Sequence, residues 1–282
     1  MLLLLLIWTV DAVAVSVAVE AMSQIFLLCF KTLCSIPVLA VFVGCREGIR
    51  LPRRETVPLL LLAALLGDIL YFFFEYTAYK YLPIGQVNVL LGILPAASYL
   101  TDCAVTRRKP LGRVLAAIVL SIAGLGLAVW SDGGVSLRGC GSCALCILIW
   151  ILYGYVARRL DAWYSPETIT LYESVAAVAV MLPFAVLNRP AAIGTRDLLF
   201  SIVGMGILTT GFGYIIEVRG LIDLGTTASG IYLNLLPVLT ALAGFLFLGE
   251  RMTGFQLAGS GLVILCGIYV VLKLDRSGGG VS

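Results

Sequence analysis

The chain has 282 residues, of which 61% are hydrophobic and only 12% are charged; its formal net charge is +3 and it contains no histidine. Soluble domains carry about 25% charged residues, so this composition excludes a water-soluble protein and indicates an integral membrane protein. The lack of histidine removes the commonest general base and the usual zinc ligand, and with them most hydrolase and metalloprotease mechanisms.

Apolar segments of membrane-spanning length follow one another along the chain, because a helix of roughly 20 apolar residues crosses a bilayer core. The connections between them are short, so no soluble domain fits anywhere. The ten predicted helices comprise residues 2–19, 23–44, 57–79, 82–105, 113–130, 140–157, 166–187, 198–218, 226–247 and 254–272. The sequence therefore predicts an all-α integral membrane protein with ten transmembrane helices.

The second half of the chain repeats features of the first half at an offset of 142 residues. Five predicted helices fall in each half, and a unit with an odd number of helices re-enters the membrane upside down when it is repeated. We therefore expect two inverted five-helix repeats, residues 1–132 and 138–274. The matching pairs are Trp8 with Trp150, Ser23 with Ser165, Lys31 with Glu173, and Pro95 with Pro237.

Lys and Arg are concentrated in the connections on one side of the predicted membrane. Cytoplasmic connections carry an excess of these residues, so the bias predicts that both termini are cytoplasmic and that the loops near Asp132 and Arg196 are external. We expect a multi-pass protein of the plasma (inner) membrane. The cytoplasmic set is Arg46, Arg50, Arg53, Arg54, Arg107, Arg108, Lys109, Arg113, Arg158, Arg159, Arg219, Lys273 and Arg276.

Three cysteines with the spacing C-x-x-C-x-x-C allow two interpretations: Cys140, Cys143 and Cys146. The spacing resembles the beginning of an iron–sulfur ligand run, yet the fourth ligand is missing. At the start of a predicted transmembrane helix these residues fit small apolar packing groups, and we favour this interpretation. We therefore expect no metal and no other cofactor.

Charged side chains within the predicted helices indicate where function resides, because each costs about 2.5–3.5 kcal/mol at the bilayer centre unless it has a partner. Asp11 lies about ten residues before the turn that joins the first two predicted helices, and Lys31 lies about ten residues after it. Both residues therefore reach the same depth in the membrane and can form an ion pair. The equivalent residues of the second half, Tyr153 and Glu173, can form a hydrogen bond instead. A structural clamp and a substrate site both fit this pattern.

One face of the predicted third helix is polar, and lipid would not tolerate such a face. Asp68 lies near mid-depth on it and is the candidate for binding a coupling proton or cation, while Glu75 lies nearer the outer end. The residues of this face are Asp68, Tyr71, Phe72, Glu75 and Tyr79, and those of its counterpart in the eighth helix are Thr210, Gly213, Tyr214 and Glu217.

The candidate site residues are the aromatic, amide and charged groups that the predicted helices hold within the membrane. Each can also be a packing residue. The predicted substrate-binding residues are Trp8, Asp11, Tyr71, Glu75, Asn88, Trp150, Tyr153, Tyr214, Tyr232 and Asn234, and the predicted coupling or buried charges are Lys31, Asp68, Glu173 and Glu217.

The second half carries a recognisable series of elements: Leu236-Pro237, then Leu248-Gly249-Glu250-Arg251, then Gly259 and Gly267. With Tyr214 and Leu221–Gly230 before it, this series resembles the EamA-like repeat of the drug/metabolite transporter superfamily. The first half departs from the pattern, since it has Arg107-Arg108-Lys109-Pro110 where the Glu of this element is expected.

The resemblance implies a secondary active transporter or exporter of a small organic metabolite that works by alternating access. Lys31 is the only predicted buried cation, so we favour an amino-acid-like or amphipathic drug-like substrate over a phosphorylated one. The alternatives are a nucleotide-sugar or sugar-phosphate antiporter of the same superfamily, and, from other classes, a histidine-free membrane enzyme or a non-transporting scaffold. The expected partners are the small-molecule substrate, the lipid bilayer, protons as coupling ion and a second copy in a homodimer, but no nucleic acid.

Overall fold

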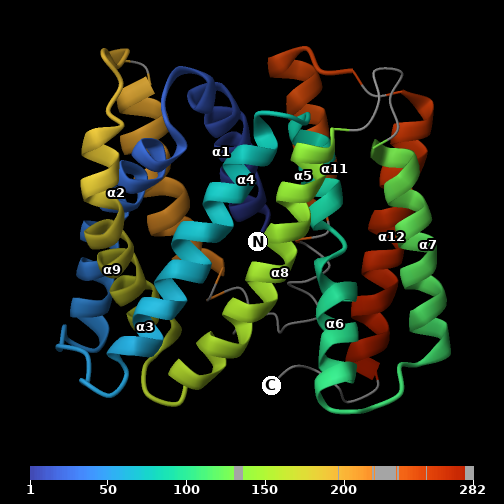
Figure 1. Cartoon of the computed structure of the whole chain (residues 1–282), viewed down its shortest axis with the longest axis horizontal. Coiled ribbons are helices and arrows are strands. Elements are labelled where there is room, and N and C mark those ends of the chain that lie inside the picture. The colour runs from blue at the N-terminus through green and yellow to red at the C-terminus, as the bar shows by residue number, and fades with distance from the viewer. Residues whose placement is uncertain are drawn as a thin grey trace.

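The computed structural model describes residues 1–129, 136–195, 197–217, 219, 233, 235–251 and 253–276. In these parts of the chain all regular structure is helical, and Figure 1 shows the helices standing side by side in one bundle. Eight described spans are long and apolar enough to cross a membrane, and two shorter apolar helices, Gly112–Leu127 and Leu236–Leu248, correspond to the predicted fifth and ninth segments.

The helices follow the predicted segments closely. Four segments differ from one continuous α-helix: the fourth is interrupted, and the third, eighth and ninth contain π-helical stretches. Those of the first half are α1 (Leu2–Ala21), α2 (Gln24–Arg46), α3 (Val57–Ala63), η1 (Ala64–Leu70), α4 (Tyr71–Tyr79), α5 (Ile84–Leu91), α6 (Leu94–Val105) and α7 (Gly112–Val129). Those of the second half are α8 (Leu137–Leu160), α9 (Pro166–Leu187), η2 (Asp197–Gly204), η3 (Gly206–Gly213), α11 (Leu236–Ala243), η4 (Gly244–Leu248) and α12 (Gly254–Arg276). The η elements are π-helical stretches.

The second helix of each half begins in the same way. Ser23 caps α2 by accepting a hydrogen bond from the N–H of Phe26, and Ser165 caps α9 by accepting one from the N–H of Thr168, both at 3.3 Å. A serine hydroxyl at this position satisfies one of the N–H groups that the first turn of a helix leaves unpaired. The offset between the halves seen in the sequence thus corresponds to matching local structure.

The predicted helix 82–105 is not continuous. The structure divides it into α5 and α6 at Gly92 and Ile93, and Pro95 lies in the first turn of α6. Proline has no N–H to donate, so it fits the first turn of a helix and disfavours the interior. Pro237 holds the same position in α11 of the second half.

The predicted third and eighth helices contain wide π-helical turns, which the sequence analysis did not anticipate. The stretch η1 lies between α3 and α4, while η2 and η3 make up most of the span Leu199–Glu217. Such turns are frequent at functional sites. A π-helical turn also rotates the residues that follow it around the helix axis, so a side-chain face read at α-helical spacing does not continue through η1.

Helices from one half pack against helices from the other. The closest pairs are α2 with α9 and α7 with α12, and further pairs are α4 with α8, α5 with α11, and α1 with η3. Figure 1 shows α7 and α12 together at one edge of the bundle, where they share a small apolar core that includes Val114, Ile118 and Val270. The larger core joins α1, α2, α4 and α9.

A carboxylate of the second half caps a helix of the first half. Glu250 Oε1 accepts a hydrogen bond from the N–H of Ile84 at 3.1 Å, at the start of α5. Burial raises the pKa of the Glu250 carboxyl, although the N–H groups of Ile84 and Gly85 lower it. An acidic group at a helix N-terminus is stabilised by the helix dipole. This contact gives the Glu of the Leu-Gly-Glu-Arg element a structural role between the halves.

Candidate functional site

The predicted ion pair between Asp11 and Lys31 is confirmed. Lys31 Nζ lies 2.6 Å from both carboxylate oxygens of Asp11, and the Lys31 side chain is only 3% exposed. Lys31 also donates to the hydroxyl of Tyr76 at 3.2 Å. The sequence analysis did not single out Tyr76, and no spacing pattern pointed to it, because it reaches Lys31 from a third helix. All three donors of the ammonium group thus have acceptors in the protein.

The predicted hydrogen bond of the second half is confirmed as well. The hydroxyl of Tyr153 donates to Glu173 Oε2 at 3.1 Å. The other oxygen of this carboxyl, Glu173 Oε1, is buried without a hydrogen-bond partner, and so is Asp68 Oδ2. Glu173 and Asp68 interact electrostatically across the two halves. Buried polar atoms are nearly always paired, so two unpartnered carboxyl oxygens in one region need an explanation.

The polar face predicted for the third helix is divided into two clusters. Glu75 lies beside Tyr71 and Tyr79 and in electrostatic range of Asp11 and Lys31, and we call these five residues the Glu75 cluster. Asp68 lies seven residues before Glu75, within η1, and it neighbours Tyr153 and Glu173 of the second half instead.

The second group, which we call the Asp68 cluster, consists of Asp68, Tyr153, Glu173 and Tyr214. It combines residues from η1, α8, α9 and the span Leu199–Glu217. Gly67 makes this possible, because a Cβ at this position would lie 2.7 Å from the Tyr153 ring. The Tyr153 ring therefore packs directly on the backbone of η1.

A row of aromatic rings connects the two clusters. The Tyr71 and Trp150 rings lie 4.9 Å apart, and the Trp150 and Tyr153 rings 5.2 Å apart. Trp150, the middle ring of the row, is 36% exposed. Aromatic faces of this kind bind apolar groups and cations.

The remaining candidates are placed as follows. The indole of Trp8 lies against η3, since a Cβ on Gly213 would be 3.4 Å from Trp8 Nε1. The amide of Asn88 donates to Ile84 O at 2.9 Å, and Asn88 also contacts Tyr79 at the edge of the Glu75 cluster. Glu217 is in electrostatic range of Tyr214. Tyr232 and Asn234 lie outside the described residues.

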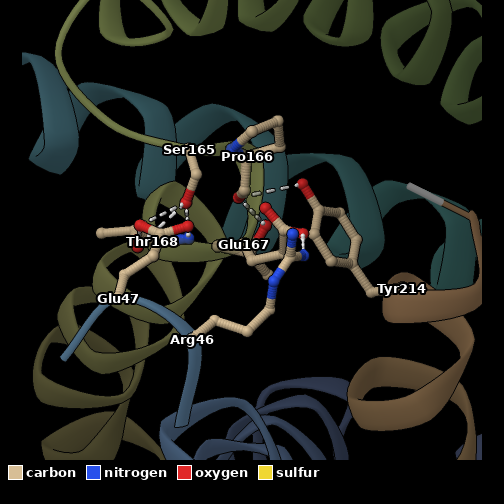
Figure 2. Close-up of polar contacts among 8 residues, drawn as sticks. Arg46, Glu47, Ser165, Pro166, Glu167, Thr168 and Tyr214 are labelled. Atoms are coloured by element: carbon tan, nitrogen blue, oxygen red, sulfur yellow. Dashed lines mark hydrogen bonds and ion pairs between the residues drawn. The ribbon is translucent and has the colours of Figure 1, made fainter. Parts of the chain in front are cut away.

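Polar contacts also join α2 to α9 at one end of the pair, as Figure 2 shows. Arg46 forms an ion pair with Glu167 at 2.8 Å, and Glu47 accepts hydrogen bonds from the hydroxyls of Ser165 and Thr168. Tyr214 donates to the carbonyl oxygen of Pro166 at 3.3 Å. At the other end of the same helix pair, the hydroxyl of Ser23 donates to the carbonyl oxygen of Asn188. Charged contacts therefore hold one end, and a neutral hydrogen bond holds the other.

The cysteine run contacts the Glu75 cluster. Cys143 and Cys146 are buried, and the Cys146 thiol donates to the carbonyl oxygen of Tyr71 at 3.4 Å. Among the described residues, no group of three or more Cys, Asp or Glu side chains is arranged to hold a metal ion. Cys143 and Cys146 occupy packing positions in α8.

The sequence profile of the EamA-like transporter family matches residues 1–130 and again residues 137–273. The chain belongs to the EamA-like transporter family. It is also similar to the threonine/homoserine exporter RhtA of Escherichia coli (strain K12), a protein of the drug/metabolite transporter superfamily, with 27% identity over 234 residues that cover 81% of this chain and 75% of RhtA.

Two further similarities extend over nearly the whole EamA-like chain. An uncharacterized transporter of Archaeoglobus fulgidus is 24% identical over 276 residues, which cover 95% of this chain and 94% of that protein. A solved crystal structure of 21% sequence identity superposes with a TM-score of 0.68 over 98% of this chain and 96% of the other chain, which shows a common fold. The EamA-like family and the apolar helices together make this protein a multi-pass membrane transporter with a small-molecule substrate.

Proposed function

We propose that this protein is a secondary active exporter of small zwitterionic or cationic metabolites, with two inverted five-helix repeats, residues 1–132 and 138–274, that alternate access across the membrane. The helix contacts support a two-fold relation between the repeats, because exchanging the two halves turns one observed helix pair into another, and the odd number of predicted helices in each half makes the second copy inverted. In this exchange α1 becomes α8, and η3 becomes α4, so the contact of α1 with η3 becomes the observed contact of α8 with α4. The second helices of the two halves, α2 and α9, contact each other and exchange places.

The Glu75 cluster is the observation that carries the proposed substrate class. It contains two carboxylates and one ammonium group, and Lys31 is already bound to Asp11 and Tyr76. Glu75 is thus the carboxylate left to receive a positive charge, and the rings of Tyr71 and Tyr79 beside it favour a cation further. A substrate ammonium group fits here better than a phosphate.

Threonine and homoserine are the first candidates, because RhtA, named as their exporter, resembles this chain over 81% of its length. In this assignment the ammonium group of the amino acid binds Glu75. The hydroxyls of Tyr71 and Tyr79 hydrogen-bond Glu75 and hold its carboxyl in place, and the exposed part of Trp150 contacts the side chain of the amino acid. The Glu75 cluster belongs to the first half, and Trp150 of α8, whose ring lies 4.9 Å from that of Tyr71, brings the second half into the site. Transporters built from inverted repeats place their substrates between the halves.

Ligand-dependent thermal stability of the purified protein tests the substrate class. A ligand that binds only the folded state stabilises it by about 2.7 kcal/mol at a concentration of 100 Kd. L-Threonine or L-homoserine should raise the unfolding temperature of the wild type and of Glu55→Gln, a control variant with an exposed carboxyl. Neither amino acid should raise the unfolding temperature of Glu75→Gln.

A sugar phosphate or nucleotide sugar should leave the unfolding temperature unchanged. Stabilisation by a sugar phosphate that disappears in Lys31→Met would contradict the proposal. It would instead favour a phosphate antiporter of the same superfamily, with Lys31 as the anion-binding group.

A further inference from the structure

The two halves differ at the position of Lys31, a buried cation of the first half. Lys31 of α2 and Glu173 of α9 occupy equivalent places, since both follow the capping serine of their helix by eight residues. Lys31 neutralises Asp11 within the first half. The second half has no such built-in cation at this place, because its equivalent residue is itself an acid.

Glu173 is 2% exposed, and Tyr153 satisfies one of its two carboxyl oxygens. The other, Oε1, has no partner, and neither does Asp68 Oδ2 on the helix that packs against α9. The titratable groups that face this pair are the hydroxyls of Tyr153 from α8 and of Tyr214. α2 also packs along α9, but its Lys31 is already bound to Asp11 and Tyr76.

Two ionised carboxylates without a cation would be costly at this place. A single charge costs about 2.5–3.5 kcal/mol at the bilayer centre, and mutual repulsion adds to the cost of two. A cation must therefore accompany the pair for most of the time. A metal ion needs about six oxygen ligands. The phenols of Tyr153 and Tyr214 already donate to Glu173 and to the carbonyl oxygen of Pro166, and only two carboxyl oxygens of the cluster are buried without a partner. A proton needs only one oxygen to bind and a second to receive its hydrogen bond.

We propose that Asp68 and Glu173 form a proton-binding carboxyl pair between the two halves, in which one exchangeable proton takes the place that Lys31 holds permanently in the first half. The proton bound to one carboxyl lets it donate to an oxygen that otherwise has no partner. The pair is separate from the Glu75 cluster, which retains its own ammonium group.

The role of this proton in transport rests on the proposed function. Asp68 and Glu75 are seven residues apart on the same helix, about 10 Å at 1.5 Å per residue. Because Asp68 and Glu173 belong to different halves, movement of one half against the other changes how water reaches the pair. The proton passes from water on one side to a carboxyl oxygen, and later from that oxygen to water on the other side, while substrate moves in the opposite direction.

The pH dependence of unfolding tests the proton site without any substrate. If the folded state holds a proton that the unfolded chain has released, the folded state binds more protons, and stability falls as the pH rises. The wild type in detergent should therefore lose stability from neutral to alkaline pH. Glu173→Lys supplies a fixed cation beside Asp68, so its profile should be flatter over the same range.

Two further variants keep the test valid if Glu173→Lys fails to fold. The double variant Asp68→Asn with Glu173→Gln has nearly the same shape and no carboxyl at the pair, so its profile should also be flatter than that of the wild type. Glu55→Gln, which removes an exposed carboxyl, should keep the wild-type profile. A double variant whose profile matches the wild type in slope would overturn the proton site.

Transport in proteoliposomes separates this proposal from the proposed function. With L-homoserine as the probe, a pH gradient should drive accumulation by the wild type but not by the double variant, which should still exchange homoserine down its own gradient. Homoserine transport that the double variant still couples to the pH gradient would overturn the proton site alone. A wild type with the expected pH profile and no homoserine flux would leave the proton site standing and contradict the substrate assignment.

Discussion

Asp11 and Lys31 neutralise each other's charge within the membrane-spanning helices. Removing one partner of a buried pair leaves an uncompensated charge and costs about 3–5 kcal/mol, whereas removing both is often tolerated. Asp11→Asn and Lys31→Met should each reduce the yield and the unfolding temperature of purified protein. The double variant should recover much of this loss. Additive losses in the double variant would show that the two residues act separately.

Arg107 has a backbone conformation that suits glycine. Its φ is 54°, in the left-handed region, and the equivalent residue of the second half is Gly249, with a φ of 68°. A side chain in this region costs about 1–2 kcal/mol, part of which is offset because glycine is more flexible in the unfolded chain. Arg107→Gly should raise the unfolding free energy by about 0.5–1 kcal/mol. Arg108→Gly, the neighbouring control, should bring no gain, and an equal gain from both would refute the argument from backbone conformation.

At the level of residues, the sequence predicted the pairs Asp11 with Lys31 and Tyr153 with Glu173, because residues equidistant from a tight turn reach the same depth in the membrane. It could not predict Tyr76, which reaches Lys31 from a third helix. Contacts of that kind depend on how helices are rotated and placed, and neither hydropathy nor spacing along one helix contains this information.

Among the elements, η1 is the one that shapes the candidate site. A Cβ on Gly67 would lie 2.7 Å from the Tyr153 ring, so Gly67→Ala must displace a ring that holds Glu173. Overpacking of this kind costs about 1–3 kcal/mol. Gly126→Ala is a matched control in α7, where a Cβ would meet nothing within 4 Å. Thermal unfolding should show a loss for Gly67→Ala only, and equal behaviour of the two variants would contradict the close approach.

The sequence did not reveal η1 or the interruption between α5 and α6. Hydropathy reports that a segment is apolar, and a face read at 3.6 residues per turn assumes an uninterrupted α-helix. Asp68 and Glu75 fit one face on that assumption, but in the structure Asp68 lies within η1 and the two residues belong to different clusters. Gly92 and Pro95 were visible signals for the interruption of the predicted helix 82–105.

For the whole molecule, the proposed inverted topology predicts which loops are accessible from outside. In a background without the eight native cysteines, a membrane-impermeant thiol reagent added outside should label Asp132→Cys and spare Arg53→Cys. Asp132 lies outside the described residues, whereas Arg53 is exposed in the connection before α3. Labelling of Arg53→Cys alone would show the opposite orientation of the protein in the membrane. Equal labelling of both positions would show that no membrane separates them.

The overall architecture was largely predictable, because apolar segments of bilayer length can only be satisfied as helices in lipid. The offset of 142 residues also indicated which helices correspond between the halves. Which helices pack together was not predictable. The pairing of α2 with α9 and of α7 with α12 joins residues far apart in the chain, and it depends on side-chain fit rather than on hydropathy.

Homoserine counterflow into proteoliposomes tests the central claim most directly, because it measures carrier transport without an imposed ion gradient. Liposomes loaded with unlabelled L-homoserine should transiently accumulate labelled L-homoserine through the wild type and through Glu55→Gln. Glu75→Gln should lose most of this accumulation while remaining folded. No counterflow by the wild type, or full counterflow by Glu75→Gln, would contradict a substrate site in which Glu75 receives the ammonium group.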